Sequence, residues 1–454
     1  MNRVRGMLSG MSLNARAARS GLLTVAGYGG GQFIRLASNL ILTRLLFPEA
    51  FGIMALILVA MIGLSLFSDV GITPAIMQSK RGDDQDFLNT AWTIQVIRGF
   101  LLWAVAGIMA YPYATFFEEP QLAQMLPVAA ISLAIAGFRP TRLDTANRHL
   151  MLGRVTAIDL VVQVFGVSVA VLLAWWTGSV WALVFSNVIG AIADLVLNST
   201  FLPGLRNRFK VEKEALKELI NFGKWVFLST VCGFLYQQID KMMIGKYLPI
   251  DTLGVYNIGT TLATVTWFLS ALLARRLLIP IYRETPPAES RENFLKLRKM
   301  RAIATYGLLS MAAVFALSGV WLIDVLYDPR YAAAGPVVVM IAVAHMPLLI
   351  AATYDQAALA LGDSRSFFVL SFSRAALTGI CIWLGLEYAG LLGALWGQIF
   401  AALLVYPVVV WLARKAKAWD PAHDSFFAVV AMAIAAVAFW LNGDAIRALG
   451  PAGF

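Results

Sequence analysis

Residues 234–257 read FLYQQIDKMMIGKYLPIDTLGVYN, an apolar stretch in which a carboxylate and an ammonium group, Asp240 and Lys241, stand side by side. A charged group at the centre of a lipid bilayer costs roughly 3 kcal/mol on insertion scales. Charges kept inside such a stretch therefore face other protein groups or a water-filled cavity. The fold depends on how many stretches of this kind the chain contains, and the function depends on what their charges contact.

The composition of the whole chain is that of a membrane protein. Of its 454 residues, 59% are hydrophobic and 14% are charged, and the mean hydropathy is +0.74, whereas soluble domains carry about 25% charged residues. Apolar runs of about 20 residues are long enough to cross a bilayer as helices. Thirteen such runs cover residues 21–46, 52–77, 90–111, 122–138, 157–177, 180–202, 222–245, 253–280, 302–326, 333–361, 366–387, 389–413 and 425–442. The sequence therefore predicts an all-α polytopic membrane protein.

Basic residues fall mostly on one side of these predicted spans. With the N-terminus inside the cell, the cytoplasmic segments hold 29 of the 36 Lys and Arg residues, as expected for short cytoplasmic loops. This asymmetry predicts a cytoplasmic N-terminus, and thirteen spans then place the C-terminus in the periplasm. Basic loops beside an anionic leaflet also account for the net charge of +10 without a nucleic-acid partner.

The chain carries no signature of catalysis, cofactor binding or secretion. Its first 20 residues are basic but lack the apolar core of a signal peptide, so we expect a retained cytoplasmic arm. Cys232 and Cys381 lie in separate spans and the three histidines show no ligand spacing, so neither a disulfide nor a metal site is expected. GYGGGQ at residues 27–32 resembles a phosphate loop but lies inside a span, which favours close helix packing. With no nucleotide loop and no nucleophile elbow, we expect a protein without cofactors that is not an enzyme.

An internal repeat relates the two halves of the chain. Sliding the sequence by 202 residues pairs Gly21 with Gly223, Gly31 with Gly233, Arg44 with Lys246, Glu49 with Asp251, and Gly52 with Gly254. A weaker match at a shift of 212 pairs Gly178, Ala182 and Leu183 with Gly390, Ala394 and Leu395. Six spans in each half give both halves the same orientation, related by an axis along the membrane normal.

The repeat predicts two six-helix lobes around a central cavity, plus one extra C-terminal span. The expected parts are a basic cytoplasmic arm at 1–20, an N-lobe at 21–203, a cytoplasmic linker at 204–221, a C-lobe at 222–415, and a thirteenth span with a periplasmic tail at 416–454. Lobes arranged in this way enclose a cavity near the middle of the bilayer.

Polar residues inside the spans are the candidates for a binding site, because they face a wet interior more often than lipid. Arg35 lies in the middle of the first span, with Gln32 and Asn39 on the same face at helical spacing. The predicted substrate-binding residues are Arg35, Arg98, Lys241, Gln32, Asn39 and Gln237. The predicted candidates for ion coupling are Asp240, Asp194 and Asp355, for which pairing between helices is the alternative. Asp240 and Lys241 point about 100° apart on a helix, so each needs a partner other than its neighbour.

Two segments carry a family resemblance. NLILTRLLFPEAFGIMALILVAMIGLSLFSDVGITPAIMQ at 39–78 has a Leu-rich end of a span, a Pro-Glu turn and then Phe-Gly, and FGKWVFLSTVCGFLYQQIDKMMIGKYLPIDTLGVYNIG at 222–259 carries IDKMMIG followed by LGVYN. Both resemble the polysaccharide transporter (Wzx-like) family of oligosaccharide flippases, within the multidrug/oligosaccharidyl-lipid/polysaccharide exporter superfamily, whose best-known members include the MATE transporters. The resemblance covers about residues 15–415 and is specific to the family but not to a substrate.

The resemblance implies a flippase of the bacterial inner membrane that acts in lipopolysaccharide, O-antigen or exopolysaccharide biosynthesis. Such a protein moves oligosaccharide repeat units linked to undecaprenyl pyrophosphate from the cytoplasmic to the periplasmic leaflet by alternating access. The implied partners are this lipid-linked oligosaccharide, membrane lipids, and the polysaccharide polymerase and chain-length machinery. Arg35, Arg98 and Lys241 would contact the pyrophosphate.

Three alternatives remain open at this point. A lipid II flippase shares the basic cavity. A multidrug antiporter of the same superfamily favours an acidic cavity, whereas the first span has Arg35 and no acid. A membrane glycosyltransferase or polymerase generally exposes a larger external loop than this chain offers.

Overall fold

The computed structural model describes residues 13–68, 71–223, 227–273, 287–360 and 364–450 of the chain, and within these ranges every regular element is a helix. Where the predicted spans fall on described residues, each lies on one of these helices or on two consecutive ones. Residues 274–280 of the predicted span 253–280 lie outside the described residues. By length and composition, eight described helices, or up to nine if a bent pair counts as one span, could cross a membrane. The predicted all-α polytopic class is confirmed.

The helices gather into two compact units, each described here by itself. Unit 1 comprises Met1–Leu46 and Ile57–Val231, and unit 2 comprises Phe47–Leu56 and Cys232–Phe454. The helices of unit 1 are α2 (Leu13–Leu45), most of α3 (Pro48–Phe67), α4 (Ile72–Gln78), α5 (Gln85–Phe117), α6 (Gln121–Ala129), α7 (Ile131–Gly137), α8 (Arg142–Arg148), α9 (Leu152–Thr177), α10 (Trp181–Phe201) and α11 (Lys213–Gly223). Those of unit 2 are most of α12 (Phe227–Tyr247), α13 (Ile250–Ala263), α14 (Val265–Leu273), α16 (Arg291–Leu326), the 3-10 turn η2 (Pro329–Tyr331), α17 (Ala334–Ala360), α18 (Ser364–Lys415), α19 (Pro421–Leu441) and α20 (Gly443–Arg447). The predicted lobe boundaries stay a prediction.

Polar caps fix where the long helices begin. The Asp84 carboxylate accepts hydrogen bonds from the backbone N–H groups of Asp86 and Phe87, both at 2.9 Å, and so starts α5. The bond from the Phe87 N–H is the largest of the effects that hold the pKa of Asp84 below its usual value. Ser290 starts α16 by accepting from the Asn293 N–H at 3.0 Å. These caps satisfy backbone donors that a helix end otherwise leaves unpaired.

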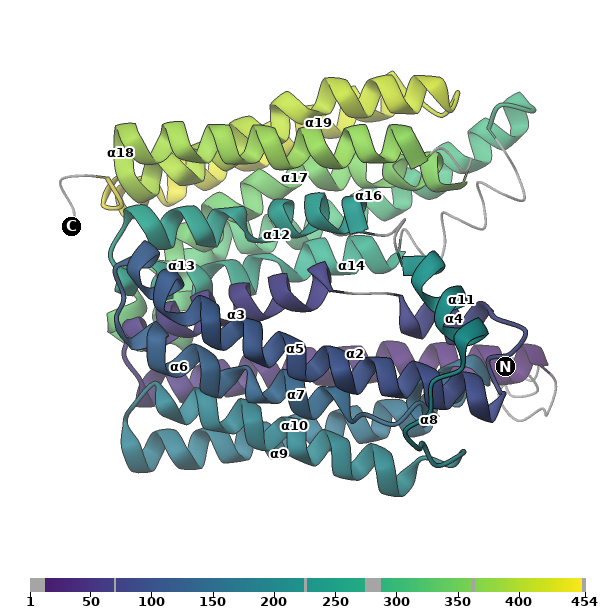
Figure 1. Cartoon of the computed structure of the whole chain (residues 1–454). Helices are drawn as coiled ribbons and strands as arrows, with labels where there is room; N and C mark the ends of the chain where they lie inside the picture. Colours follow the sequence, from purple (N-terminus) through teal and green to yellow (C-terminus); the bar gives the residue numbers. More distant parts are fainter. Residues whose placement is uncertain (1–12, 69–70, 224–226, 274–286, 361–363, 451–454) are drawn as a thin grey trace. The chain divides into compact units, whose positions relative to one another are not determined.

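Helix α2 packs closely on α9 within unit 1, and α9 runs beside α10 (Figure 1). A Cβ atom on Gly27 would lie 2.0 Å from Thr156 Cγ2, and one on Gly31 would lie 3.0 Å from Gln163 Oε1. The Gln163 side chain donates a hydrogen bond to the Gly31 carbonyl at 2.8 Å. Helix α2 is continuous through residues 27–32, and Gly27 and Gly31 pack closely on α9, whereas a Cβ on Gly29 would meet no atom within 4 Å.

Helix α18 is two helices joined by a hairpin. The backbone leaves the helical region at Ala389 and at Gly390, whose φ of 55° is left-handed. The two arms then run side by side (Figure 1), and Gly385 and Gly393 meet where a Cβ on either would lie 2.0 Å or less from the other's carbonyl oxygen. The two arms correspond to the predicted spans 366–387 and 389–413.

A second close contact joins two residues that the internal repeat pairs. A Cβ on Gly52 of α3 would lie 2.0 Å from the Ile250 carbonyl oxygen, and a Cβ on Gly254 of α13 would lie 1.9 Å from the Pro48 carbonyl oxygen. Each glycine therefore packs on the first turn of the other's helix. This reciprocal crossing accounts for the grouping of Phe47–Leu56 with unit 2.

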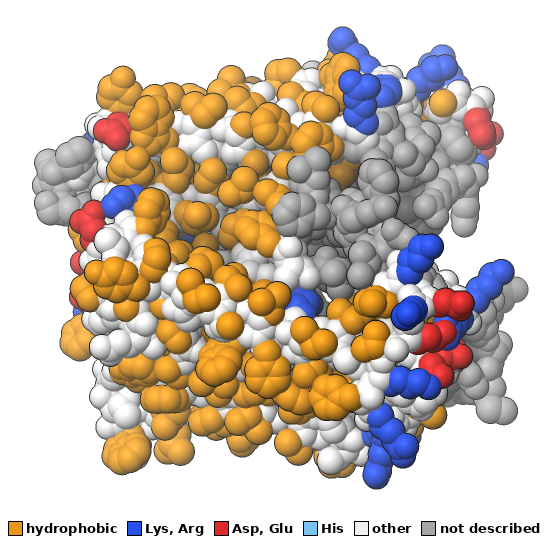
Figure 2. Space-filling view, in the orientation of Figure 1, with side chains coloured by type: hydrophobic (Ala, Val, Ile, Leu, Met, Phe, Trp, Pro, Cys, Tyr) orange, Lys and Arg blue, Asp and Glu red, His pale blue; other side chains and the backbone are white. Residues whose placement is uncertain are grey.

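The outer surface suits a lipid environment. On the face drawn in Figure 2, hydrophobic side chains cover the lengths of the helices, whereas Lys, Arg, Asp and Glu gather at the ends. Trp176 in the last turn of α9 and Trp440 in the last turn of α19 are each 80% exposed. Exposed tryptophans at helix ends are typical of the boundary between acyl chains and headgroups.

Candidate substrate-binding site

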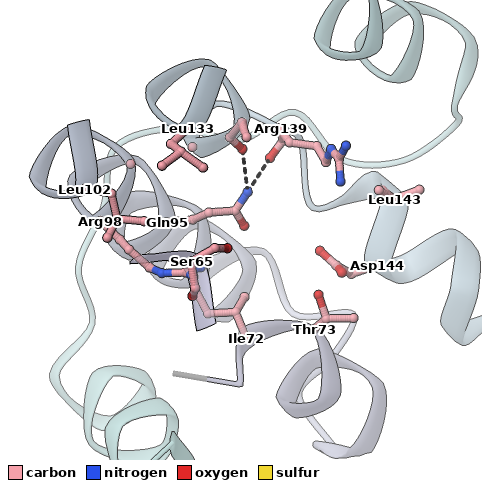
Figure 3. A pocket seen from close by; sticks show the side chains of 13 residues that line it. Ser65, Ile72, Thr73, Gln95, Arg98, Leu102, Leu133, Arg139, Leu143 and Asp144 are labelled. Carbon is pink, nitrogen blue, oxygen red and sulfur yellow. Dashed lines mark hydrogen bonds between the residues drawn. The ribbon is translucent and has the colours of Figure 1, made fainter. Parts of the chain in front are cut away.

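Arg98 lines a polar cavity of about 200 Å³ inside unit 1 (Figure 3). Helices α3, α5, α7 and α8 form its walls, together with the start of α4. The Arg98 Nε–H donates to Ser68 Oγ at 2.9 Å, and a second N–H donates to the Ser65 carbonyl. These bonds hold the guanidinium at the end of α3, so Arg98 is a fixed part of the wall.

A second guanidinium, that of Arg139, lines the same cavity. Arg139 forms an ion pair with Asp194 of α10, whose other carboxylate oxygen accepts a bond from Asn198 Nδ2 at 2.8 Å. Gln95 bonds the Ala136 carbonyl at 3.1 Å and so ties α5 to α7. Asp194, predicted as a coupling candidate, is thus placed in a contact that joins α10 to the turn before α8.

The volume of this cavity limits what it can hold. Ligand pockets usually measure about 300–1,000 Å³, and one water occupies about 30 Å³. A cavity of about 200 Å³ accommodates several waters or a phosphate-sized group but not an oligosaccharide. Its two guanidiniums and the Gln95 amide suit an anion, whereas Asp144 on the opposite wall suits a hydroxyl or a cation (Figure 3).

Arg35, Gln32 and Asn39 of α2 belong to unit 1 but are not among the residues that line this cavity. Arg35 is exposed, and Gln32 and Asn39 are half-buried. Within the described part of the chain, Arg35 forms no ion pair. Its side chain is therefore available to a ligand or to groups outside the described contacts of unit 1.

Asp240 belongs to a hydrogen-bonded chain inside unit 2. The Tyr256 hydroxyl of α13 donates to Asp240 Oδ2, and the Gln398 amide of α18 donates to the Tyr256 oxygen at 2.8 Å. The other carboxylate oxygen of Asp240 is buried and has no hydrogen-bond partner among the described residues. One acceptor position on Asp240 therefore remains open within the helix bundle.

Lys241 and Gln237 lie on other faces of the same helix. Lys241 Nζ donates to Gln238 Oε1 at a long 3.4 Å, and Gln237 is exposed. Lys241 is half-buried and does not pair with Asp240, as helical spacing required. The side chain of Asp355, the remaining coupling candidate, lies outside the described residues, although its backbone belongs to α17.

Unit 2 contains a buried polar cluster that was not predicted from the sequence. The Arg301 side chain is 1% exposed, donates to Thr353 Oγ1 at 3.0 Å and to the Ala418 carbonyl at 2.8 Å, and lies over the Tyr354 ring. The hydroxyls of Tyr354 and Tyr406 both donate to Asp424, which also contacts the His423 ring. This cluster joins α16, α17, α18 and α19 through polar side chains.

Arg298 and Asp420 complete the cluster at the start of α19. Both Asp420 oxygens accept bonds from the Arg298 guanidinium, and Asp420 also caps α19 by accepting from the His423 N–H at 3.2 Å. Burial raises the pKa of Asp420, but the bonds from Arg298 and His423 outweigh burial and hold it below its usual value. The polar end of the thirteenth predicted span is therefore anchored to α16 as an ion.

The fold is that of a known class of membrane transporters. A lipid II flippase MurJ in an inward closed conformation matches with a TM-score of 0.71 over 94% of this chain and 96% of that one, at 11% identity. An inward-facing multidrug resistance MATE family transporter matches with a TM-score of 0.57 over 91% of this chain and 96% of that one, at 14% identity. At these identities the likeness concerns the fold alone.

Sequence comparison then defines the family. The model of the family described as "Polysaccharide biosynthesis protein" matches residues 41–336, so the chain belongs to this family. It is 20% identical to the teichuronic acid biosynthesis protein TuaB of Bacillus subtilis over 76% of this chain and 71% of that protein. It is 20% identical to the lipopolysaccharide biosynthesis protein WzxC of Escherichia coli over 83% of this chain and 77% of that one. The predicted resemblance to Wzx-like polysaccharide transporters is confirmed.

Proposed function

We propose that this chain flips an oligosaccharide repeat unit, carried on undecaprenyl pyrophosphate, from the cytoplasmic to the periplasmic leaflet of the bacterial inner membrane. One observation carries the proposal. A chain of the polysaccharide biosynthesis family places the cations of Arg35, Arg98 and Lys241 inside long helices that are mostly apolar. Cations at such positions are costly in lipid and typically mark the path of a charged substrate.

The chemistry of the substrate explains why cations are needed. Sugar hydroxyls are expensive to leave unpaired in hydrocarbon, and a pyrophosphate charge is more expensive still. A polar cavity solvates the headgroup while the lipid tail stays in the bilayer, and alternating access exposes that cavity to each side of the membrane in turn. This work is transport, so no covalent step is assigned to the protein.

The residue roles follow from charge and hydrogen-bonding capacity. Arg35 and Lys241, on repeat-related helices, bind the pyrophosphate, with Arg35 able to form two parallel bonds and Lys241 acting as a point charge. Gln32, Asn39 and Gln237 bond sugar hydroxyls. Asp240, with its open carboxylate oxygen, is the leading group for ion coupling.

Orientation completes the proposal. Basic residues gather on the cytoplasmic side, as the positive-inside rule requires, so the N-terminus is cytoplasmic. The flipped unit then reaches the periplasmic leaflet, where a polysaccharide polymerase and the chain-length machinery act on it.

Removal of single cations tests the proposal. Arg35→Ala and Lys241→Ala should each abolish polymer export in cells at unchanged membrane levels, and Arg35→Lys should restore it in part because it returns the charge without the fork. Arg447→Ala is the matched control, because it removes an exposed cation at the far end of the chain. Export at the wild-type level by both Arg35→Ala and Lys241→Ala would exclude these residues from the site.

A further inference from the structure

The connection between α10 and α11, residues 203–212, lies along the first turns of α5 as an extended segment. The Gln85 amide donates to the Arg206 carbonyl at 3.1 Å, Asn89 Oδ1 accepts from the Arg208 N–H at 2.9 Å, and Thr93 Oγ1 accepts from the Lys210 N–H at 3.1 Å. On the segment, every second residue (206, 208 and 210) forms one of these hydrogen bonds. On α5, every fourth residue (85, 89 and 93) forms one. An extended strand matched to a helix face in this way holds its backbone in one fixed place.

This placement builds a basic pocket. A cavity of about 500 Å³ lies between the segment and α5, lined by Arg206, Arg208, Lys210, Asp86, Gln85 and Asn89, with Phe209 beside them. Lys210 is neutralised by Asp86 at 2.7 Å. Among the residues that the structure describes, neither Arg206 nor Arg208 forms an ion pair. The pocket therefore presents two guanidinium groups that have no ion-pair partner among the described residues, on a backbone that hydrogen bonds to α5 hold in place.

Apolar side chains border the same pocket on the outside. Phe209 is 67% exposed and packs on the Trp92 ring with centroids 4.8 Å apart, while Leu205 and Val211 are 45% and 53% exposed. Exposed apolar groups beside basic ones are typical of a surface that lies at the boundary between headgroups and acyl chains.

The length of α5 places the pocket at that depth. Its 33 residues extend about 50 Å at 1.5 Å per residue, against a hydrocarbon core of about 30 Å. The apolar run predicted at 90–111 occupies the core, so the first turn of α5 and the Arg206 and Arg208 side chains lie among headgroups. In Figure 2, Lys and Arg gather together with Asp and Glu at the end of unit 1 where α4, α8 and α11 lie.

We propose that this pocket binds the phosphate of an anionic phospholipid, with Arg206 and Arg208 on the headgroup and Phe209 against the upper acyl chain. Its assignment to the cytoplasmic leaflet rests on the orientation proposed above. The bound lipid secures the connection between α10 and α11 in the membrane interface.

The test measures lipid binding to the purified full-length chain by native mass spectrometry. The probes are phosphatidylglycerol, which is anionic, and phosphatidylcholine, which has no net charge. Each cation near an anionic headgroup is worth about a fivefold change in affinity, so Arg206→Gln with Arg208→Gln should weaken phosphatidylglycerol binding about 30-fold and leave phosphatidylcholine unchanged. Arg206→Lys with Arg208→Lys keeps both charges and should stay within about threefold of wild type.

The matched control is Arg291→Gln with Lys299→Gln, which removes two exposed cations from the start of α16 in unit 2. This control should bind phosphatidylglycerol as wild type does. Equal binding by the Gln pocket variant and wild type, or equal losses in pocket and control variants, would overturn the proposal. Displacement of phosphatidylglycerol by millimolar inorganic phosphate would instead assign the pocket to free phosphate and refute the lipid. Binding is read without transport, so its failure leaves the proposed flippase function standing.

Discussion

The reciprocal contact of Gly52 and Gly254 gives a prediction whose size follows from distances. A methyl group on Gly52 would lie 2.0 Å from the Ile250 carbonyl oxygen, and one on Gly254 would lie 1.9 Å from the Pro48 carbonyl oxygen. Carbon and oxygen normally approach no closer than about 3.3 Å, so α3 and α13 must separate by more than 1 Å to admit either methyl. Both obstacles are backbone atoms and cannot rotate away.

The energies can be set against each other. Overpacking costs about 1–3 kcal/mol, and the backbone obstacles place this case near 3 kcal/mol. Ala gains about 1 kcal/mol over Gly inside a helix. Gly52→Ala and Gly254→Ala should each destabilise the protein by about 2 kcal/mol. Gly107→Ala, the matched control inside α5, meets no atom within 4 Å and should stabilise by up to about 1 kcal/mol.

The assay is thermal unfolding of the purified protein in detergent. We expect the apparent melting temperature to fall by several degrees in Gly52→Ala and Gly254→Ala and to stay level or rise in Gly107→Ala. The double variant Gly52→Ala with Gly254→Ala should lose less than the sum of its parts, because one separation of the helices relieves both clashes. Melting temperatures of Gly52→Ala and Gly254→Ala that match Gly107→Ala would refute the close crossing.

Three other predictions concern topology, pH and energy coupling. Reporter fusions after residues 210 and 290 should report cytoplasm and a fusion near 328 periplasm, and a periplasmic signal at 290 would contradict the orientation. Because the pKa of Asp420 is lowered in the folded state, its stabilising effect is present above its unfolded pKa and is lost as the pH falls through the folded pKa. The Asp420→Asn variant should therefore have a lower melting temperature than wild type at pH 7 and lose less further stability below about pH 4. An unchanged melting curve would show that Asp420 does not anchor α19 to α16. Moving one elementary charge of an anionic headgroup across the membrane is worth about 2.3 kcal/mol per 100 mV. Flipping in proteoliposomes should therefore speed up when a potassium-valinomycin potential makes the substrate-loaded side negative. Asp240→Asn should remove a dependence on an ion gradient but keep this voltage dependence. Flipping that ignores voltage at fixed pH and sodium would contradict uncompensated charge movement.

The sequence predicted the helices well because spanning a bilayer imposes a length and a polarity on each of them. Within the described residues, the apolar runs lie on helices. The repeat pairs Gly52 with Gly254 as equivalent positions, and in the structure each packs on the other's helix, a contact that the repeat did not predict. The hairpin inside α18 lies where the sequence predicted a break between two spans. Its turn residues, Ala389 and Gly390, closely follow Glu387, at the boundary between the predicted spans 366–387 and 389–413.

The polar contacts were less predictable because they join residues distant in sequence. Arg139 directly follows the predicted span 122–138, yet it lines the cavity with Arg98 and pairs with Asp194. Arg301 directly precedes the predicted span 302–326 but is buried. One signal was available, since Asp420 and Asp424 are four residues apart at the start of an apolar span and therefore share one helix face. Their partners on α16 could be found only from the fold.

Reconstitution tests the central claim most directly. Purified protein is placed in vesicles with an undecaprenyl-pyrophosphate-linked oligosaccharide that carries a fluorophore on the sugar, and an impermeant reductant then bleaches every label that reaches the outer leaflet. The account predicts that wild-type vesicles lose nearly all fluorescence and that Arg447→Ala behaves in the same way. Arg35→Ala and Lys241→Ala should retain the inner-leaflet half for far longer. Bleaching that stops at half in wild-type vesicles, as in vesicles without protein, would contradict the assignment of this chain as a flippase.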